Sequence, residues 1–372
     1  MTGAYLCESM SHGLLGHGSP PATLLINLAS NFLFLRNGAN VRGHGVPHSV
    51  HRGLRKHIPR SAFGGRSPRP TPFVPRPTSL VPTTSPQSLV PMLARLAPTP
   101  SGYLHQGNLL AFLVQEDLAK RHGAALGLRI DDLDRERYRE EYLLDIFRCL
   151  DALGIVPAFG PKNPEAFHRA YRQELRLPRY RDVLEQLKAK NLLYACHCSR
   201  KALSEAGAHA CPGGCAEQGV SFDEPEVLWR LHCPDDAVAQ WRDGFLGEVR
   251  IDLRARMGDA VLRRRDGLPA YQITSLTDDH DLQIDLLVRG EDLLESTALQ
   301  LWLSERLWGP AEVIRYHHPL LKTPNGEKLS KSAGAAAKPL ELGREQVKEL
   351  RAMVTDLVNN RDEGRGARGE EE

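Results

Sequence analysis

Four thiols in two close pairs could hold a metal ion. They are Cys196, Cys198, Cys211 and Cys215. Two pairs of thiols separated by about a dozen residues suit a tetrahedral Zn²⁺ site, which thiolates form readily. His197 or His209 could replace one thiol, and the alternative is a set of reduced cysteines in a loop-rich insertion. Zinc here would have a structural role, in folding a small insertion.

Strands and helices alternate after residue 91, and they must position any site. The apolar pattern predicts strands at residues 95–97 and 125–130, and helices from 109 up to Gly123 and from about 139 to 153. Pro98–Gly102 forms a tight loop after the first strand, and Gly154 ends the second helix. This order predicts an α/β fold with a Rossmann-type parallel sheet, in which ligands bind at the carboxyl ends of the strands.

The composition separates an N-terminal segment from an enzyme-like remainder. The chain is 41% apolar and 25% charged with a net charge of +2, as in ordinary globular enzymes. Before Met92 the only acidic residue is Glu8, and residues 61–91 are dense in Pro, Ser, Thr and Arg. Such a segment is a disordered extension, a transit peptide, or upstream DNA translated from an early start codon. Met92 directly precedes the first predicted strand, which favours the last interpretation.

The loop after the first strand resembles a known signature. The stretch RLAPTPSGYLHQGN is similar to the HIGH signature of class I aminoacyl-tRNA synthetases, in the form used by the glutamyl branch. Near the C-terminus, the stretch GEKLSKS at Gly326–Ser332 resembles the KMSKS loop of the same enzymes. The two stretches occur in the family's order, about 220 residues apart. Together they resemble a class I synthetase catalytic domain with a C-terminal KLSKS loop region.

The resemblance implies activation of an amino acid by ATP. A carboxylate attacks the α-phosphate and pyrophosphate leaves, so catalysis needs positioning and charge stabilisation rather than a protein nucleophile. The family pattern assigns catalysis to His105, Lys328 and Lys331, and ATP binding to His105, Gly107, Asn108 and Lys331. Mg²⁺ is expected on the phosphates. Asn108 departs from the pattern, which usually has a second histidine there.

Further stretches resemble the glutamyl branch and imply L-glutamate as the substrate. They are LRIDDLDR, PAYQ followed by DDH, and VRGEDL. The glutamate-binding residues implied in this way are Arg95, Ala97, Thr99, Asp131, Tyr271 and Arg289. Two arginines suit a diacid, because a guanidinium matches a carboxylate with two parallel hydrogen bonds. Asp131 stands where the family has Glu, and it would meet the amino group from a shorter side chain.

The C-terminal region is short for a glutamyl-tRNA synthetase, which carries a large anticodon-binding body. Only 40 residues of the 372 follow Ser332, with one helix predicted around 342–357 and a tail from Asn359. A short synthetase with a zinc-bearing insertion resembles the glutamyl-queuosine tRNA(Asp) synthetase family, over about residues 93–339. That resemblance implies activation of glutamate without tRNA, and transfer to queuosine in the anticodon of tRNA(Asp).

The expected organisation has five parts. They are the N-terminal segment 1–91, the first catalytic half 92–193, the zinc-bearing insertion 194–250, the second catalytic half with the KLSKS loop 251–345, and a helix or tail 346–372. No run of 18 apolar residues occurs, so we expect a cytoplasmic monomer without a membrane span. The alternatives are a minimal glutamyl-tRNA synthetase that charges a tRNA 3′ end, a non-catalytic RNA-binding paralogue, and a small HIGH-type nucleotidyltransferase.

Overall fold

The first strand is buried along its whole length although it contains an arginine. β1 (Leu93–Leu96) has four buried residues, including Arg95. It pairs in parallel with β2 (Ala125–Leu128) on one side and with β8 (Leu286–Gly290) on the other. A charged side chain in a central strand is costly unless it is paired. The buried Arg95 of β1 therefore requires a partner that compensates its charge.

Six strands form the main sheet. The computed structural model describes residues 91–198, 211, 213–320 and 338–366, so residues 1–90 and the predicted KLSKS loop lie outside it. The sheet has the order β2-β1-β8-β9-β5-β6, with β9 at Ile314–His318, β5 at Val238–Asp243 and β6 at Gly247–Asp252. All neighbouring strands are parallel except β5 and β6. The predicted α/β class with a mostly parallel sheet is confirmed.

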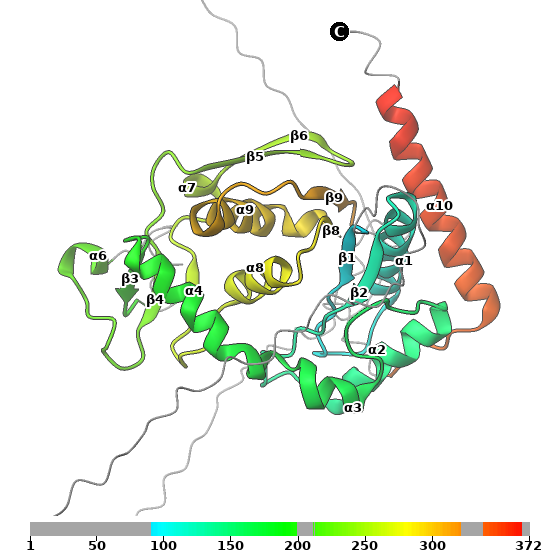
Figure 1. Ribbon diagram of the computed structural model, residues 1–372, viewed down its shortest axis with the longest axis horizontal. Coiled ribbons are helices and arrows are strands. Elements are labelled where there is room, and N and C mark those ends of the chain that lie inside the picture. The colour runs from blue at the N-terminus through cyan, green and yellow to red at the C-terminus, as the bar shows by residue number, and fades with distance from the viewer. Residues whose placement is uncertain (1–90, 199–210, 212, 321–337, 367–372) are drawn as a thin grey trace, which may run out of the picture. The chain divides into compact units, whose positions relative to one another are not determined.

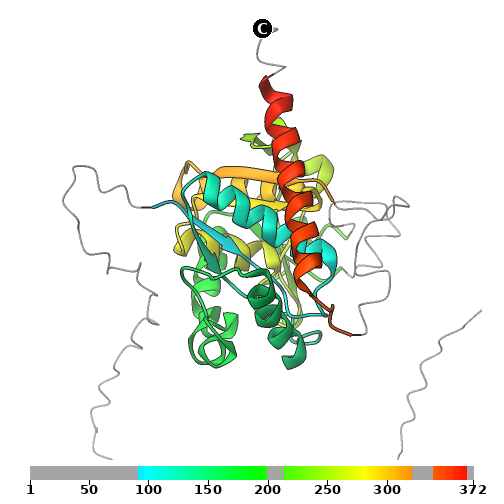
Figure 2. The same ribbon diagram turned by 90° about the vertical axis from the view of Figure 1, so that its right-hand side faces the viewer.

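Helices cover both faces of this sheet. α1 (Gln106–Arg121) connects β1 to β2, and α9 (Leu294–Trp308) connects β8 to β9. These two connections run in opposite directions along the sheet, so right-handed crossovers place their helices on opposite faces. Figure 1 shows α1 on one side of β1, with α9 and α8 (Tyr271–Asp281) on the other. α10 (Arg344–Gly366) crosses the outer side of α1 (Figure 2).

The helix ends follow local sequence signals to different degrees. α2 (Glu140–Leu153) ends at Gly154, whose φ of 69° lies in the left-handed region that favours glycine. The strands are displaced from the predicted ranges, since β1 begins two residues earlier and β2 ends two residues earlier. α10 continues to Gly366, so the tail predicted from Asn359 is wrong in part. The helix therefore continues past Val358, which is buried in the core.

A smaller antiparallel sheet contains Cys196, the first of the four predicted metal ligands. It has the order β3-β4-β7, at Leu193–Cys196, Leu228–Leu231 and Val261–Arg263. The remaining elements are α3 (Pro164–Ala166), a π-helical turn (Phe167–Tyr171), 3₁₀ turns (Gln173–Arg176 and Glu291–Leu293), α4 (Leu177–Ala189), α6 (Cys215–Gln218) and α7 (Leu253–Arg256). β5 and most of β6 fall within the predicted insertion 194–250, but they extend the main sheet, because Asp243 pairs with Arg315 of β9.

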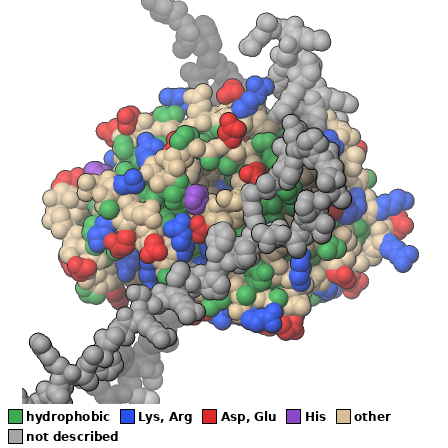
Figure 3. Space-filling model, in the orientation of Figure 1, with side chains coloured by type: hydrophobic (Ala, Val, Ile, Leu, Met, Phe, Trp, Pro, Cys, Tyr) green, Lys and Arg blue, Asp and Glu red, His purple; other side chains and the backbone are tan. Residues whose placement is uncertain are grey.

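The surface carries charges of both signs. On the face drawn in Figure 3, Lys and Arg side chains are interspersed with Asp and Glu side chains over the described residues. Among the helices that the structure describes, none combines the length and apolar character needed to cross a bilayer.

Candidate active site

A cavity of about 240 Å³ lies where β1 and β8 end. Six of the residues predicted for substrates line it, namely Arg95, Ala97, Thr99, Asn108, Tyr271 and Arg289. A larger cavity of about 430 Å³ is lined by none of the predicted substrate residues. The smaller cavity is therefore the candidate active site, at the edge of a parallel sheet where ligands bind in α/β folds.

Three guanidinium groups converge on a single carboxylate beside this cavity. Arg95 donates to both oxygens of Asp279, from Nε at 2.9 Å and from Nη2 at 3.0 Å. Arg129 Nη1 donates to Asp279 Oδ1 at 2.7 Å, and Arg289 Nη2 donates to Asp279 Oδ2 at 3.2 Å. The three arginines are buried. Asp279, in α8, thus holds together arginines that come from three different strands or strand ends.

The positive charge of this cluster shifts the titration of its members. Burial alone would raise the pKa of Asp279, but the charges of Arg95, Arg129 and Arg289 outweigh burial and hold that pKa well below its usual range. Burial lowers the pKa of Arg289, and the nearby guanidinium groups of Arg95 and Arg129 lower it further. The cluster is therefore crowded with cations, and an additional anion in the cavity would be stabilised.

Arg289 has one nitrogen, Nε, without a hydrogen-bond partner among the residues that the structure describes. Its Nη1 donates to Thr297 Oγ1 at 3.0 Å, and its Nη2 donates to Gln300 Oε1 at 2.7 Å as well as to Asp279. Its Nε is buried and has no hydrogen-bond partner among the residues that the structure describes. A buried donor left without an acceptor is costly, so it calls for a specific partner. Because Arg289 lines the cavity, a ligand carboxylate could be that partner.

Asp131, which was expected to meet a substrate amino group, is paired with a neighbouring arginine. Arg129 donates to both of its oxygens, from Nε at 2.7 Å and from Nη2 at 3.0 Å. Asp131 is buried, and it is not among the residues that line the cavity. Its carboxylate is engaged by a guanidinium two residues earlier in the chain, which the local sequence did not indicate.

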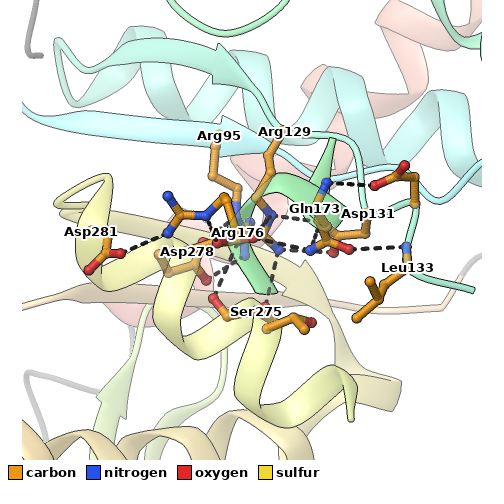
Figure 4. A network of polar contacts seen from close by, with 12 residues as sticks. Arg95, Arg129, Asp131, Leu133, Gln173, Arg176, Ser275, Asp278 and Asp281 are labelled. Atoms are coloured by element: carbon orange, nitrogen blue, oxygen red, sulfur yellow. Dashed lines mark hydrogen bonds and ion pairs between the residues drawn. The ribbon is translucent and has the colours of Figure 1, made fainter. Parts of the chain in front are cut away.

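A second layer of polar groups supports Arg129 and Asp131 (Figure 4). Asp278 lies in this layer and accepts from Arg176 Nε at 2.6 Å and from Gln173 Nε2 at 3.1 Å. Burial raises the pKa of Asp278, against the opposing effect of the nearby Arg129 and Arg176 cations. Arg176 also donates to Asp281 at 2.7 Å. This layer links α8 to the turn before α4, so the arginine cluster rests on several elements rather than on one loop.

The start of α1 carries the residues predicted for ATP. α1 begins at Gln106, directly after His105, and Gly107 lies in its first turn. Asn108 Oδ1 accepts from the His105 N–H at 3.1 Å, so this side chain stabilises the helix start. Asn108 also lines the cavity, whereas His105 and Gly107 are not in its wall. The first turn of a helix presents N–H groups suited to phosphate oxygens. Lys328 and Lys331 lie outside the described residues.

The four predicted metal ligands lie together. The Sγ atoms of Cys196, Cys198, Cys211 and Cys215 are all within 4.8 Å of one another. Cys211 Sγ lies 3.5 Å from Cys196 Sγ and 3.3 Å from Cys198 Sγ, and Cys198 Sγ lies 3.8 Å from Cys215 Sγ. Four thiolates around Zn²⁺ at about 2.3 Å would be about 3.8 Å apart, so the cluster fits this ion with a small expansion.

The surroundings of the thiols shift their pKa values in both directions, since burial raises the pKa of Cys196 and raises that of Cys198 to about 12. The buried guanidinium of Arg230 donates from Nε to Cys196 Sγ at 3.3 Å. Burial raises the pKa of the Cys211 thiol, but hydrogen bonds from the Cys215 N–H and the neighbouring thiols outweigh burial and lower that pKa to about 7. Thiolates are the form that binds metal. The candidate metal centre therefore has suitable ligands and a cation that offsets part of their charge.

Comparison with known proteins agrees with this geometry. Residues 91–358 match the family model described as tRNA synthetases class I (E and Q), catalytic domain. The chain belongs to this family. It is therefore an aminoacyl-tRNA synthetase-like ligase with the catalytic domain of that class, as predicted.

Individual relatives show the extent of the match. The Glutamyl-Q tRNA(Asp) synthetase of Dechloromonas aromatica is 36% identical over 270 residues, which are 71% of this chain and 85% of the relative. The protein of the same name from Pseudomonas aeruginosa is 39% identical over 249 residues, 67% of this chain and 80% of the relative. A Glutamate–tRNA ligase of Dehalococcoides mccartyi is 35% identical over 251 residues, 65% of this chain and 51% of the relative.

A solved structure shares the fold. The glutamate-tRNA synthetase of Elizabethkingia anophelis aligns with a TM-score of 0.53 and 28% sequence identity, over 66% of this chain and 53% of that chain. The chain thus spans about half the length of this solved relative.

Some residues of the synthetase site were not predicted from the sequence. Asp279 and Arg129 lie in the stretches that resemble the glutamyl branch, but their pairing roles were missed. Gln115 also lines the cavity, seven residues after Asn108. With Ala111 and Phe112, these two positions form one face of α1 at helical spacing. That spacing is the signal that could have identified Gln115.

Proposed function

We propose that this protein activates glutamate with ATP, without tRNA, and transfers the glutamyl group to queuosine in the anticodon of tRNA(Asp). The buried Nε donor of Arg289, which has no partner among the described residues, carries the first half of the proposal. Arg289 lines a cavity of about 240 Å³ together with Arg95, and Arg129 shares their acceptor Asp279. An anionic amino acid of the size of glutamate supplies the carboxylate that this donor requires.

The first step forms glutamyl-adenylate. An oxygen of the glutamate α-carboxylate attacks the α-phosphorus of ATP, the bond to the β-phosphate oxygen breaks, and pyrophosphate leaves. In the proposal, Arg95 and Arg289 hold carboxylate groups of glutamate, and Thr99 and Tyr271 add hydroxyl contacts from the same cavity wall. Asp131 is proposed to meet the amino group with acceptor capacity that remains beside its two hydrogen bonds from Arg129.

The phosphates are expected at the start of α1. His105 and Gly107 lie at that start, and Lys328 and Lys331 are proposed to meet the charge of the leaving pyrophosphate. Mg²⁺ bound to the phosphates would supply further charge neutralisation. No protein side chain has to become covalently modified in this step.

The second step transfers the glutamyl group to RNA. A hydroxyl of the cyclopentenediol of queuosine attacks the activated carbonyl carbon, an ester bond forms, and AMP leaves. The relatives support this acceptor, because two proteins named Glutamyl-Q tRNA(Asp) synthetase match over 85% and 80% of their lengths. The proposed zinc centre at Cys196–Cys215 would fold the segment that lies beside the acceptor RNA.

A second candidate is a synthetase that charges the 3′ end of a tRNA. The 35% identity to a Glutamate–tRNA ligase favours it, although the match covers only 51% of that relative. Both candidates require the same glutamate site, so they differ in the RNA group that accepts glutamate.

The test separates activation from transfer. Glutamate-dependent exchange of pyrophosphate into ATP is measured without tRNA, and labelled glutamate is then offered to tRNA(Asp) with and without queuosine. A matched tRNA(Asp) that carries queuosine but lacks its 3′-terminal adenosine serves as the control. Exchange without tRNA, and labelling of the shortened tRNA, are expected. Labelling that depends on the 3′ adenosine would identify a 3′-charging enzyme, and absence of exchange with any amino acid would contradict catalysis.

A further inference from the structure

Three buried side chains form a line behind Arg289. Asp243 Oδ2 lies 2.6 Å from His317 Nδ1, and His317 Nε2 lies 2.9 Å from Thr297 Oγ1. Thr297 Oγ1 accepts from Arg289 Nη1 at 3.0 Å. His317 and Asp243 are completely buried, and Thr297 is nearly so. The line crosses β5, β9 and α9 before it reaches β8, and each contact joins two different elements.

The hydrogen-bond partners of Asp243, His317 and Thr297 determine which of their atoms carry protons. Asp243 also accepts from the N–H groups of Phe245 at 2.9 Å and of His317 at 3.1 Å, as expected of an ionised carboxylate. His317 Nδ1 must then carry a proton and donate it to Asp243. Because Thr297 Oγ1 accepts from Arg289, its own proton is free to point to His317 Nε2. This arrangement is satisfied throughout by a neutral imidazole protonated on Nδ1.

The terminal nitrogens of Arg289 are held by hydrogen bonds in the same way. Thr297 accepts from Nη1. Asp279, Gln300 and Ser275 accept from Nη2. These contacts hold Nη1 and Nη2 of Arg289, and its Nε remains without a partner among the described residues. Without the Thr297 contact, the guanidinium could rotate and use Nε or Nη1 elsewhere.

We propose that His317 and Asp243, acting through the Thr297 hydroxyl, are positioning residues that orient Arg289 toward a carboxylate of glutamate. This inference rests on the proposed function, since the orientation matters only if the cavity binds an acidic amino acid. None of the three residues lines the candidate active site, so each acts through Arg289 and not on the substrate itself.

Kinetics of two matched variants test the proposal. Thr297→Val removes the hydroxyl at nearly constant volume, whereas Thr297→Ser keeps it. In pyrophosphate exchange, Thr297→Val should raise the KM for glutamate by about tenfold, as expected when a hydrogen bond to a charged group is lost. The KM for ATP should stay within about twofold, and Thr297→Ser should stay close to the unchanged enzyme. Equal effects of both variants, or equal changes in both KM values, would overturn the positioning role.

A second pair of variants distinguishes a loss of positioning from a loss of folding. His317→Asn keeps a donor near the Nδ1 position for Asp243 but loses the contact to Thr297, and His317→Gln does the reverse. The Asn variant should therefore raise the glutamate KM more than the Gln variant. The opposite order would contradict transmission through Thr297.

A spectroscopic measurement separates this inference from the proposed function. With ¹⁵N-labelled histidine, the His317 signal, assigned by its loss in His317→Asn, should show the neutral form protonated on Nδ1. A neutral form protonated on Nε2 would overturn the proposed line whether or not the enzyme is active. Isothermal titration with glutamate tests the proposed function itself. If the hydrogen bonds from Asp243 to Thr297 are present but glutamate does not bind, the proposed function and the positioning role that depends on it are both rejected.

Discussion

Replacing Asp279 by asparagine should destabilise the fold strongly. Asp279 accepts four hydrogen bonds from Arg95, Arg129 and Arg289, at 2.7–3.2 Å. Asparagine has the same shape, but it removes the negative charge and turns an NH₂ group toward guanidinium donors. Arg95 and Arg289 would then lose their carboxylate partner, whereas Arg129 would keep Asp131.

The expected magnitude follows from the burial of these groups. The arginine side chains of the pairs with Asp279 are 3–7% exposed, and the aspartate side chain is 15% exposed. Loss of one partner from a buried ion pair costs about 3–5 kcal/mol, because the opposite charge stays buried without compensation. We expect this loss in the free energy of unfolding at pH 7, and a decrease in Tm of about 10 °C.

The matched control is Asp117→Asn. Asp117 pairs with Arg121 at 2.6 Å on the surface of α1, with side chains 31% and 35% exposed. An exposed pair one helical turn apart contributes about 0.5 kcal/mol or less. Urea unfolding followed by circular dichroism compares the two variants with the unchanged protein. A loss below about 1 kcal/mol for Asp279→Asn would refute the reasoning that Asp279 holds the arginine cluster.

The pH dependence gives a second check on the same variant. The pKa of Asp279 is lowered in the folded protein, because the three arginine charges outweigh burial. A lowered folded-state pKa adds stability above the unfolded-state value near 4, and this contribution disappears as the pH falls below it. The difference between the unchanged protein and Asp279→Asn should thus be largest near pH 7 and shrink below about pH 4. A difference that stays constant down to pH 3 would exclude this electrostatic origin.

Three further perturbations address the other parts of the site. Arg289→Lys should raise the KM for glutamate about tenfold or more, because lysine lacks the Nε donor and the planar fork, and an unchanged KM would contradict the assignment. Cys198→Ser should lower the zinc content and the Tm, measured by atomic absorption and thermal unfolding, and a full complement of tightly held zinc would remove Cys198 from the ligand set. Lys331→Ala should sharply reduce pyrophosphate exchange at an unchanged Tm, and an unchanged exchange rate would exclude the role of this lysine.

Local patterns in the sequence were sufficient for the elements and for part of the site. The stop of α2 at Gly154 follows from the left-handed conformation that glycine tolerates. Arg95 and Arg289 were expected at one site because their stretches resemble the glutamyl branch, and both line the same cavity. The spacing of the cysteines also indicated correctly that the four thiols gather.

Pairings between distant residues could not be obtained in this way. Arg95 and its acceptor Asp279 are 184 residues apart, and Asp243 and His317 are 74 apart. The extension of the main sheet by β5 and β6, through the pairing of Asp243 with Arg315, depends on the same kind of contact.

The sequence by itself determined the family, the elements of its α/β fold and the types of residue available for a diacid, a nucleotide and a metal. Only the tertiary structure decided which carboxylate neutralises the arginines and which donor remains for a ligand. The physical reason is that a periodic pattern reports burial along one element, whereas partners for a buried charge come from whichever elements pack against it. The roles of Asp279 and Thr297 as partners of the arginines are seen only in the tertiary structure, where α8 and α9 pack against the strands that carry Arg95 and Arg289.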